Sequence, residues 1–320
     1  MINRMSWLRT WLMPILLVAE IVLFTALSPR FLTADNLGNI AFNAADLALV
    51  AAGVTLVVLL GGIDVSTGFA VGVVAWVAAQ LVGAGLPAPL VVLAAVAVGA
   101  LLGAVNGLLV TLGRVPPIIA TLGTAAIFQT LLFALWNSTD VFSGPVTTAL
   151  SGQRVLGVPV VIGVVAVVYA MLHLLLTRRR FGRDVYAIGS NREAARLAGI
   201  NTPATTFACF GLVGALVGLA ACIYLGRVGV VQASSGNELT LLAIASVVVG
   251  GTSILGGEGG VGRTLGGLAF IVILQNGVVL AGVPPLWNDL LIGAAILVAV
   301  GVDVLPALPE RRASLRRLVA

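Results

Sequence analysis

The sequence predicts an all-α polytopic membrane protein with about ten transmembrane helices, and its composition is the main reason. Of the 320 residues, 60% are apolar and only 9% are charged. A soluble domain has roughly 45–50% apolar and about 25% charged residues. One water-soluble core cannot bury such a surplus of apolar residues, so the chain needs lipid as its solvent. We expect residues 1–320 to form a single transmembrane domain.

Ten apolar stretches, separated by charged and turn-forming residues, are candidates for membrane spans. A spanning helix needs about 20 mainly apolar residues. The ten spans are predicted at residues 11–27, 41–60, 69–82, 90–112, 118–136, 158–177, 205–225, 239–255, 264–280 and 286–305. The first stretch also resembles a signal peptide, but its apolar run is long for one, and we interpret it as a helix.

The placement of basic residues orients these spans. All 17 basic residues are Arg, and cytoplasmic loops of membrane proteins are enriched in basic residues. With ten spans and both termini in the cytoplasm, 14 Arg residues lie inside and 3 lie outside. The net charge of +5 therefore reflects topology, and we do not expect the chain to bind nucleic acid.

The residue types also exclude several kinds of chemistry. A nucleotide-binding P-loop needs a Lys, and the chain has none. One His and two Cys are too few for the usual His/Cys metal sites, so we expect no metal site, and no catalytic set of residues is recognisable. Any ATP that drives this protein must be hydrolysed by another chain.

A short internal similarity predicts an inverted-topology repeat. Residues 106–109 (NGLL) precede a Val-Pro-Pro at 115–117, and residues 276–279 (NGVV) precede a second Val-Pro-Pro at 283–285. In the predicted topology the two copies lie on helices that run in opposite directions, as in many transporters. Chance similarity between Val/Gly/Leu-rich segments is the alternative.

Glycines at helical spacing predict where helices pack closely. Without a hydrophobic driving force between helices in lipid, small residues allow backbones to approach each other. The spaced glycines are Gly99, Gly103 and Gly107, then Gly214 and Gly218, then Gly262 and Gly266.

The longest cytoplasmic segment, at about 178–203, carries a short helix. Ser190 and Glu193 have the spacing of a capping box, which predicts a helix that starts at Asn191. Gly199 is a typical residue at the end of a helix. An isolated helix of about two turns is unstable in water. It must pack against the membrane domain, merely covering its inner face, or against a partner.

The same loop resembles a known motif. Glu193, Ala194 and Ala195, followed by Gly199, resemble the E-A-A-x-x-x-G loop of ATP-binding-cassette (ABC) importer permeases. Further segments resemble the sugar-importer permeases of the ribose and autoinducer-2 type: residues 62–68 (GIDVSTG), 120–124 (ATLGT), 250–257 (GGTSILGG) and 287–289 (WND). The resemblance covers nearly the whole chain in order; one departure is Thr67, where relatives usually carry Val.

The resemblance implies a function and a set of partners. The chain is expected to be a multi-pass permease subunit in a bacterial inner membrane, importing a small sugar or sugar-like solute. Two ATPase subunits would bind ATP and Mg, a second permease chain would complete the path, and an extracytoplasmic binding protein would deliver the solute. The residues expected to couple to the ATPase are Gly189, Asn191, Glu193, Ala194, Ala195 and Gly199.

Two sets of residues are candidates for contact with the solute and with the binding protein. Sugars bind to aromatic faces and to amide or hydroxyl groups, although buried amides often tie helices together instead. The candidates for the path are Asp64, Phe128, Gln129, Trp136, Gln275 and Asn276. The candidates for docking the binding protein are Asp140, Arg154, Trp287 and Asn288.

Carboxylates within apolar spans are rare and usually paired or functional. Asp64 either caps a broken helix and shapes the pathway, or caps the next helix at the cytoplasmic interface. Glu20 and Asp46 have no obvious partner in the sequence and are expected to face the bundle interior. An ion-coupled secondary transporter is the alternative function, but it predicts ionisable groups clustered near the midplane, and here they are sparse.

Overall fold

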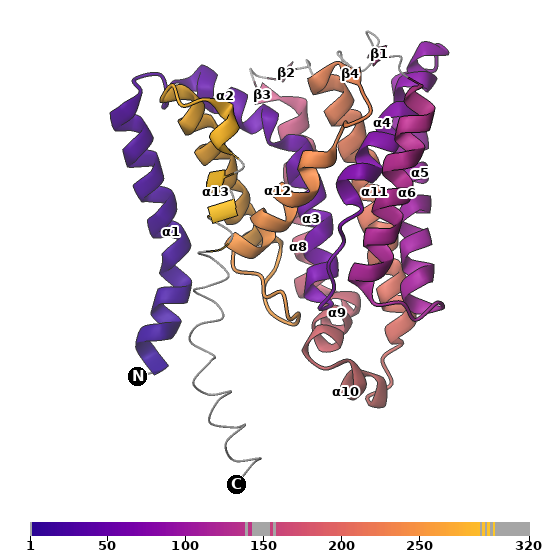
Figure 1. Ribbon diagram of the computed structural model, residues 1–320. Coiled ribbons are helices and arrows are strands. Elements are labelled where there is room, and N and C mark those ends of the chain that lie inside the picture. Colours follow the sequence, from indigo (N-terminus) through magenta and orange to yellow (C-terminus); the bar gives the residue numbers. More distant parts are fainter. Residues whose placement is uncertain are drawn as a thin grey trace.

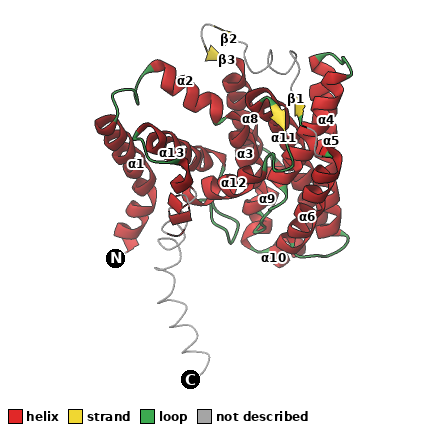
Figure 2. Ribbon diagram, turned by 45° about the horizontal axis from the view of Figure 1, so that its top comes forward, coloured by secondary structure: helices red, strands yellow, loops and turns green. Residues whose placement is uncertain are grey.

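The computed structural model describes residues 2–137, 140–142, 154–155 and 158–288, and also 290, 291, 293, 294 and 297. This part of the chain is mostly helical (Figures 1 and 2). The helices are α1 (Ile2–Leu27), α2 (Ala34–Asn43), α3 (Ala45–Leu59), α4 (Thr67–Gly83), α5 (Ala88–Thr111), α6 (Pro117–Trp136), α8 (Val160–Arg178), α9 (Arg180–Ser190), α10 (Arg192–Leu197), α11 (Thr202–Val228), α12 (Asn237–Val249), α13 (Val261–Leu280) and the 3-10 helix η1 (Pro285–Trp287).

Short strands occur at one end of the molecule, opposite α9 and α10 (Figure 1). β1 (Val141–Phe142) pairs antiparallel with β4 (Val230–Val231), and β2 (Arg154–Val155) pairs antiparallel with β3 (Val158–Pro159). The described start of α1 lies at the end that carries α9 and α10 (Figure 1).

The polytopic membrane class is confirmed. Five described helices, α5, α6, α8, α11 and α13, are long and apolar enough to cross a bilayer. The α2–α3 pair, bent by 46°, passes the same test when the two helices are taken together. Shorter apolar helices lie at Met13–Leu27, Thr67–Gly83 and Asn237–Val249. The predicted tenth span, 286–305, falls largely outside the described residues.

One predicted span ends earlier than expected. The sequence predicts a helix over 239–255, but α12 stops at Val249. Gly251 has φ +86°, a left-handed conformation that glycine adopts without steric cost. A loop over residues 250–260 therefore separates α12 from α13.

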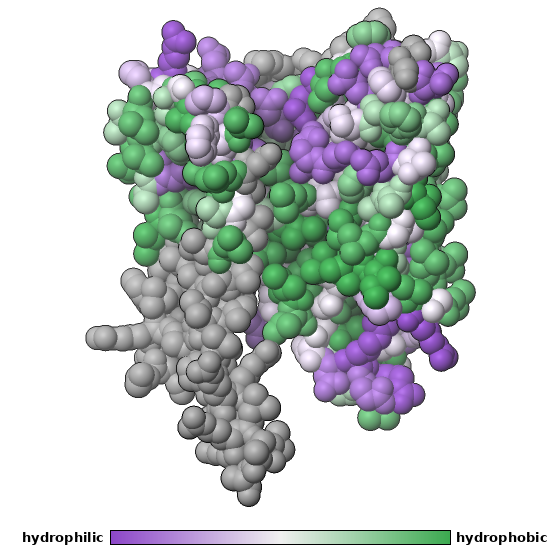
Figure 3. All heavy atoms as spheres, viewed as in Figure 1, coloured by the Kyte–Doolittle hydropathy of each residue, from purple (hydrophilic) through white to green (hydrophobic). Residues whose placement is uncertain are grey.

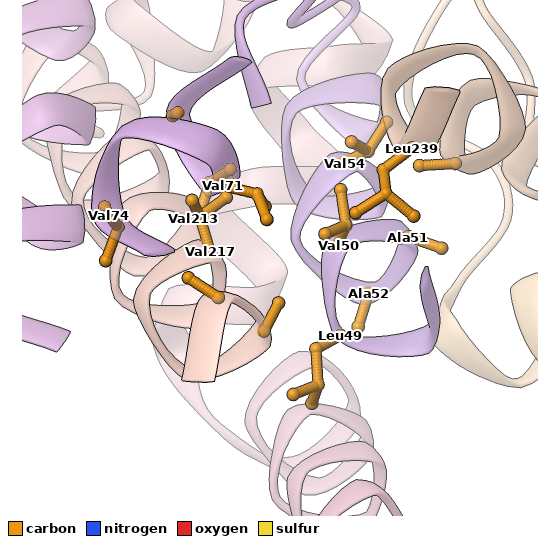
Figure 4. Packing of buried hydrophobic residues seen from close by; sticks show 14 of the residues in the cluster. Leu49, Val50, Ala51, Ala52, Val54, Val71, Val74, Val213, Val217 and Leu239 are labelled. Atoms are coloured by element: carbon orange, nitrogen blue, oxygen red, sulfur yellow. The ribbon is translucent and has the colours of Figure 1, made fainter. Parts of the chain in front are cut away.

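The core is built around α3. Every residue from Ala45 to Leu59 is buried, as expected of a helix that is hydrophobic on all sides. Figure 4 shows its side chains facing valines of α4 and α11 on one side and Leu239 of α12 on the other. The face seen in Figure 3 is mainly hydrophobic at mid-height, and hydrophilic residues gather at its upper edge and over α9 and α10.

The predicted glycine contacts hold for two helices and fail for a third. A Cβ atom at Gly99 would meet the Gly214 carbonyl oxygen, and one at Gly103 would meet that of Phe210. α5 and α11 therefore pack backbone to backbone. Within the part of the chain that the structure describes, Gly262 and Gly266 make no such contact: no atom lies within 4 Å of a Cβ built at Gly262, and one at Gly266 would touch only Met13 at an ordinary 3.7 Å. The next glycine on α13, Gly267, makes the close contact instead, against the Ser246 carbonyl oxygen.

Candidate functional site

Helix α10 is a short, exposed helix with caps at both ends. Its N-cap is Asn191, whose Oδ1 accepts a hydrogen bond from the Ala194 amide at 2.9 Å. The predicted capping box is wrong because α9 continues through Ser190, whose hydroxyl donates to the Tyr186 carbonyl at 2.9 Å. Glu193 pairs with Arg196 instead, at 2.6 Å.

The other end of α10 has the predicted glycine. Gly199 has φ +82°. Its amide donates to the Arg196 carbonyl at 3.0 Å, and the Ile200 amide donates to the Ala195 carbonyl at 3.1 Å. These two bonds form a Schellman motif, which ends a helix by satisfying its last carbonyl groups.

The outward face of α10 offers charged, apolar and small side chains to a partner. Ala195 is buried against the protein, whereas Glu193, Ala194 and Arg196 are exposed. Leu197 is 76% exposed. The Arg196 guanidinium, by hydrogen bond and by charge, lowers the pKa of Glu193. The pair therefore stays ionised at neutral pH.

Gly189 occupies a different place from the other predicted coupling residues. It lies in the last turn of α9, and a Cβ there would collide with the Leu59 carbonyl oxygen at the end of α3. Val185 and Ile188 of α9 are buried as well. This helix thus packs against the membrane domain, while α10 points away from it.

Asp64 lies in the non-helical segment between α3 and α4 and is buried. Its Oδ1 accepts hydrogen bonds from the Ser66 amide at 2.9 Å and the Ser66 hydroxyl at 2.7 Å. Asn106 of α5 donates to that hydroxyl at 2.8 Å and accepts from Thr124 of α6 at 2.6 Å. We call Asp64, Ser66, Asn106 and Thr124 the polar network.

Two further threonines hold the non-helical segment between α3 and α4. Thr121 of α6 donates to the Ile63 carbonyl at 3.0 Å and accepts from the Val65 amide at 3.2 Å. The Gly68 amide donates to Thr240 of α12 at 2.9 Å. Non-helical backbone at membrane depth is tolerated only where it is buried in protein or lines water. Side chains of α5, α6 and α12 thus supply hydrogen bonds around the break.

A pocket of about 570 Å³ lies near the end of the molecule that carries β1 and β4. Its lining residues come from the last two turns of α6 and from the segment before α12: Gln129, Thr130, Phe133, Trp136, Gln232, Ala233, Ser234 and Asn237. The lining combines two aromatic rings with several amide and hydroxyl groups. This is the chemistry that suits a small solute with apolar and polar faces.

Asp140 ties the two sides of the pocket together. It accepts a hydrogen bond from the Trp136 indole at 2.9 Å and another from the Gln232 amide at 3.1 Å. Asn237 has a buried Oδ1 with no hydrogen-bond partner among the described residues.

The pocket includes two of the predicted path residues, Gln129 and Trp136, and the structure places the others elsewhere. Phe128 is buried in the main core. Gln275 and Asn276 lie on α13, across the bundle from α6 (Figures 1 and 2). Asn276 forms two amide–amide hydrogen bonds with Asn36 of α2, at 2.9 and 3.0 Å.

The predicted docking residues are also dispersed. Asp140 lies at the pocket, and the backbone of Arg154 is in β2. Trp287 is 50% exposed in η1, and Asn288 is half-buried. The sequence did not single out six of the lining residues: Thr130 and Phe133 of α6, and Gln232, Ala233, Ser234 and Asn237. The last four belong to a Ser/Gly/Asn-rich run between two apolar helices. That run indicated only a loop.

The two carboxylates without partners in the sequence have different surroundings. Both are buried, as predicted. Asp46 receives two hydrogen bonds from the Arg227 guanidinium, at 2.7 and 3.2 Å. Neither oxygen of Glu20 has a hydrogen-bond partner among the described residues.

The chain is similar to known permeases along most of its length. Residues 36–300 match the family described as "Branched-chain amino acid transport system / permease component". The ribose import permease protein RbsC of Escherichia coli (strain K12) is 37% identical over 310 residues, covering 94% of this chain and 97% of the relative. RbsC of Haemophilus influenzae is 33% identical, covering 90% and 91%.

A second group of relatives is named for a different solute. The autoinducer 2 import system permease protein LsrC of E. coli (strain K12 / DH10B) is 32% identical over 292 residues, covering 90% of this chain and 85% of the relative. No solved structure matches the chain.

Proposed function

Because this chain belongs to the permease family matched over residues 36–300, we propose that it is the membrane-spanning subunit of an ATP-driven importer for a small sugar-like solute. The chain is a multi-pass inner-membrane protein that moves solute and performs no bond chemistry itself. ATP and Mg bind to a separate ATPase subunit, which fits a sequence without Lys. The exposed α10, with the E-A-A-x-x-x-G residues in and after it, is the observation that carries this proposal.

The relatives and the pocket both favour a small polyhydroxylated solute. The relatives are ribose and autoinducer-2 import permeases. Gln129, Trp136, Gln232 and Asn237 provide an aromatic face and side-chain amides in one pocket. We assign the pocket to the outer part of the solute path. Asp64 shapes the path indirectly, through its hydrogen bonds in the polar network.

The remaining parts of the assembly follow from the same assignment. A second permease chain, identical or related, completes the path, and an extracytoplasmic binding protein docks near Asp140, Arg154, Trp287 and Asn288. Both termini lie in the cytoplasm. The position of the start of α1 at the end that carries α10 supports this orientation (Figure 1).

We also propose that the chain forms one domain of ten spans with an inverted repeat. The two similar segments, at 106–117 and 276–285, begin on α5 and α13. These helices run in opposite directions (Figure 1), which supports the repeat.

Purification from the native host tests the proposed function. The tagged chain should retain an ABC ATPase, identified by mass spectrometry and by MgATP hydrolysis. Leu197→Glu should reduce ATPase recovery by about tenfold, since a charge replaces an apolar contact at the interface. Leu112→Glu is the matched control, because Leu112, just after α5, is also 76% exposed.

Two results would contradict the proposal. One is a chain that co-purifies with no ATPase, or a Leu197→Glu variant that retains as much ATPase as Leu112→Glu. The other is solute uptake by proteoliposomes that contain this chain alone and are driven by an ion gradient. The second result would favour the ion-coupled secondary transporter.

A further inference from the structure

The last turn of α9 approaches the end of α3 and the 250–260 loop closely at backbone atoms. A Cβ at Gly189 would meet the Leu59 carbonyl oxygen and the Gly257 amide. That amide donates to the same carbonyl at 2.9 Å. A Cβ at Gly256 would meet the Gly61 backbone. We call Gly61, Gly189, Gly256 and Gly257 the glycine junction.

The loop that contributes to this junction has a shape that glycine makes possible. Five glycines between 251 and 260 have φ values from +76° to +151°: Gly251, Gly256, Gly257, Gly259 and Gly260. Residues with a Cβ rarely adopt these conformations. Within the loop, the Ser253 amide donates to the Glu258 carbonyl at 3.0 Å. The loop therefore has a defined shape that fits against α9.

A side chain of α9 also holds the loop. The Tyr186 hydroxyl donates to the Gly259 carbonyl at 2.9 Å. The Ser190 backbone and hydroxyl lie where a Cβ at Gly257 would be. The final turn of α9 thus contacts the loop at two successive places.

Two routes lead from the junction to the outer pocket. The first passes from the end of α3 through the 60–66 segment to the polar network, which reaches Thr124 on α6; Gln129 on the same helix lines the pocket. The second passes from the loop along α12, whose first residue, Asn237, lines the opposite side of the pocket.

We propose that the glycine junction is the point where movement of α9 is transmitted to the solute path. Its four glycines and Tyr186 are positioning residues for energy coupling. Close-packed interiors are nearly incompressible, and a backbone contact has no flexible side chain to absorb a displacement. A shift of α9 therefore moves the α3–α4 break and the α12 loop together. This inference rests on the proposed function, since an ATPase must displace α9 and α10.

The test measures the pocket directly and needs no knowledge of the solute. Spin labels on Thr130→Cys and Ser234→Cys report the distance across the pocket, while both native cysteines are buried. The complex with its ATPase, purified from the native host, is compared with and without MgATP and vanadate. In the otherwise unaltered chain the label distance should change by about 2–5 Å, the range of helix shifts in transporters and switches.

Gly189→Ala should prevent a movement of α9 from reaching the pocket. In complexes that retain the ATPase, we expect the nucleotide-dependent distance change to be lost. Gly262→Ala is the matched control, because Gly262 is a helical glycine in α13, directly after the loop, and no described residue lies within 4 Å of a Cβ built there. It should retain the full change.

Tyr186→Phe is a second variant, and because it adds no atoms it cannot crowd the glycine junction. Removing its hydrogen bond to the loop should shift the nucleotide dependence of the distance change by about fivefold or more. This variant decides the matter if Gly189→Ala does not assemble.

Three outcomes would overturn the inference: an unchanged label distance in the unaltered complex, a full distance change in Gly189→Ala, or an unaltered nucleotide dependence in Tyr186→Phe. If no ATPase co-purifies with the unaltered chain, the proposed function itself fails. The two failures are therefore distinguishable.

Discussion

Replacing Arg227 by Met should destabilise the protein more than replacing its partner Asp46 by Asn. The Asp46 side chain is 0% exposed, whereas that of Arg227 is 22% exposed. Asp46 lies in the first turn of α3 and Arg227 in the last turn of α11. Each charge is therefore also favoured by the dipole of its own helix.

The magnitude follows from the distances. Two unit charges at the 2.7 Å separation of Arg227 Nη2 and Asp46 Oδ2 attract by about 6 kcal/mol at an effective dielectric constant of about 20. Desolvation of both groups offsets much of this attraction. Removing only the guanidinium leaves a buried carboxylate, whose Oδ1 already has no hydrogen-bond partner among the described residues. The expected cost is about 3–5 kcal/mol.

The reciprocal change should cost less. In Asp46→Asn the Arg227 side chain is left beside a neutral amide and keeps partial access to water. We expect a loss of about 1–3 kcal/mol. The double variant Asp46→Leu/Arg227→Met removes both charges and should recover most of the stability, because apolar replacements of a buried pair are often neutral.

Denaturant unfolding of the purified chain in detergent micelles, followed by circular dichroism, measures these differences. Arg30→Met, at an exposed arginine, is the control and should change stability by at most about 0.5 kcal/mol. A free energy of unfolding for Arg227→Met within about 1 kcal/mol of the unaltered chain would refute the reasoning. So would a double variant less stable than Arg227→Met.

Three further substitutions test the helix contacts. Gly103→Ala places a Cβ against the Phe210 carbonyl oxygen and should cost about 1–3 kcal/mol in the same unfolding assay. Gly211→Ala is the control: no described residue lies within 4 Å of a Cβ built there, and it should cost nothing measurable. Asn106→Ala removes one hydrogen-bond partner from each of two buried hydroxyl groups and should cost about 1–3 kcal/mol. A loss of only a few tenths of a kcal/mol would count against the polar network. Asn191→Ala removes the cap of α10 and should speed amide hydrogen exchange in that helix by about fivefold, as a cap worth about 1 kcal/mol implies, with no change in global unfolding.

The sequence predicted local features where one physical rule dominates. The spans are defined by their apolar residues, since backbone groups in lipid must be hydrogen-bonded within helices. The Gly199 terminus of α10 and the α5–α11 glycine packing followed from local conformational preference and small size. The start of α10 was misplaced by one residue because Ser190 could cap a helix or bond within the preceding one, and the choice depends on where α9 ends.

Residues far apart in the sequence were brought together by tertiary packing. The pairing of Asp46 with Arg227 joins positions 181 residues apart. Gln129, Gln232 and Asn237 line one pocket although they are far apart in the sequence.

The sequence by itself determined that this chain lies in a membrane and to which class of transporter it belongs. Each depends on residue composition or on motifs that are contiguous in the chain. Only the tertiary structure decided that Gly189 packs against α3, that Asp64 belongs to a buried network, and which polar groups share a pocket. Such contacts depend on how helices of nearly uniform apolar surface pack, and glycines, rather than patterns of charge, fix that packing.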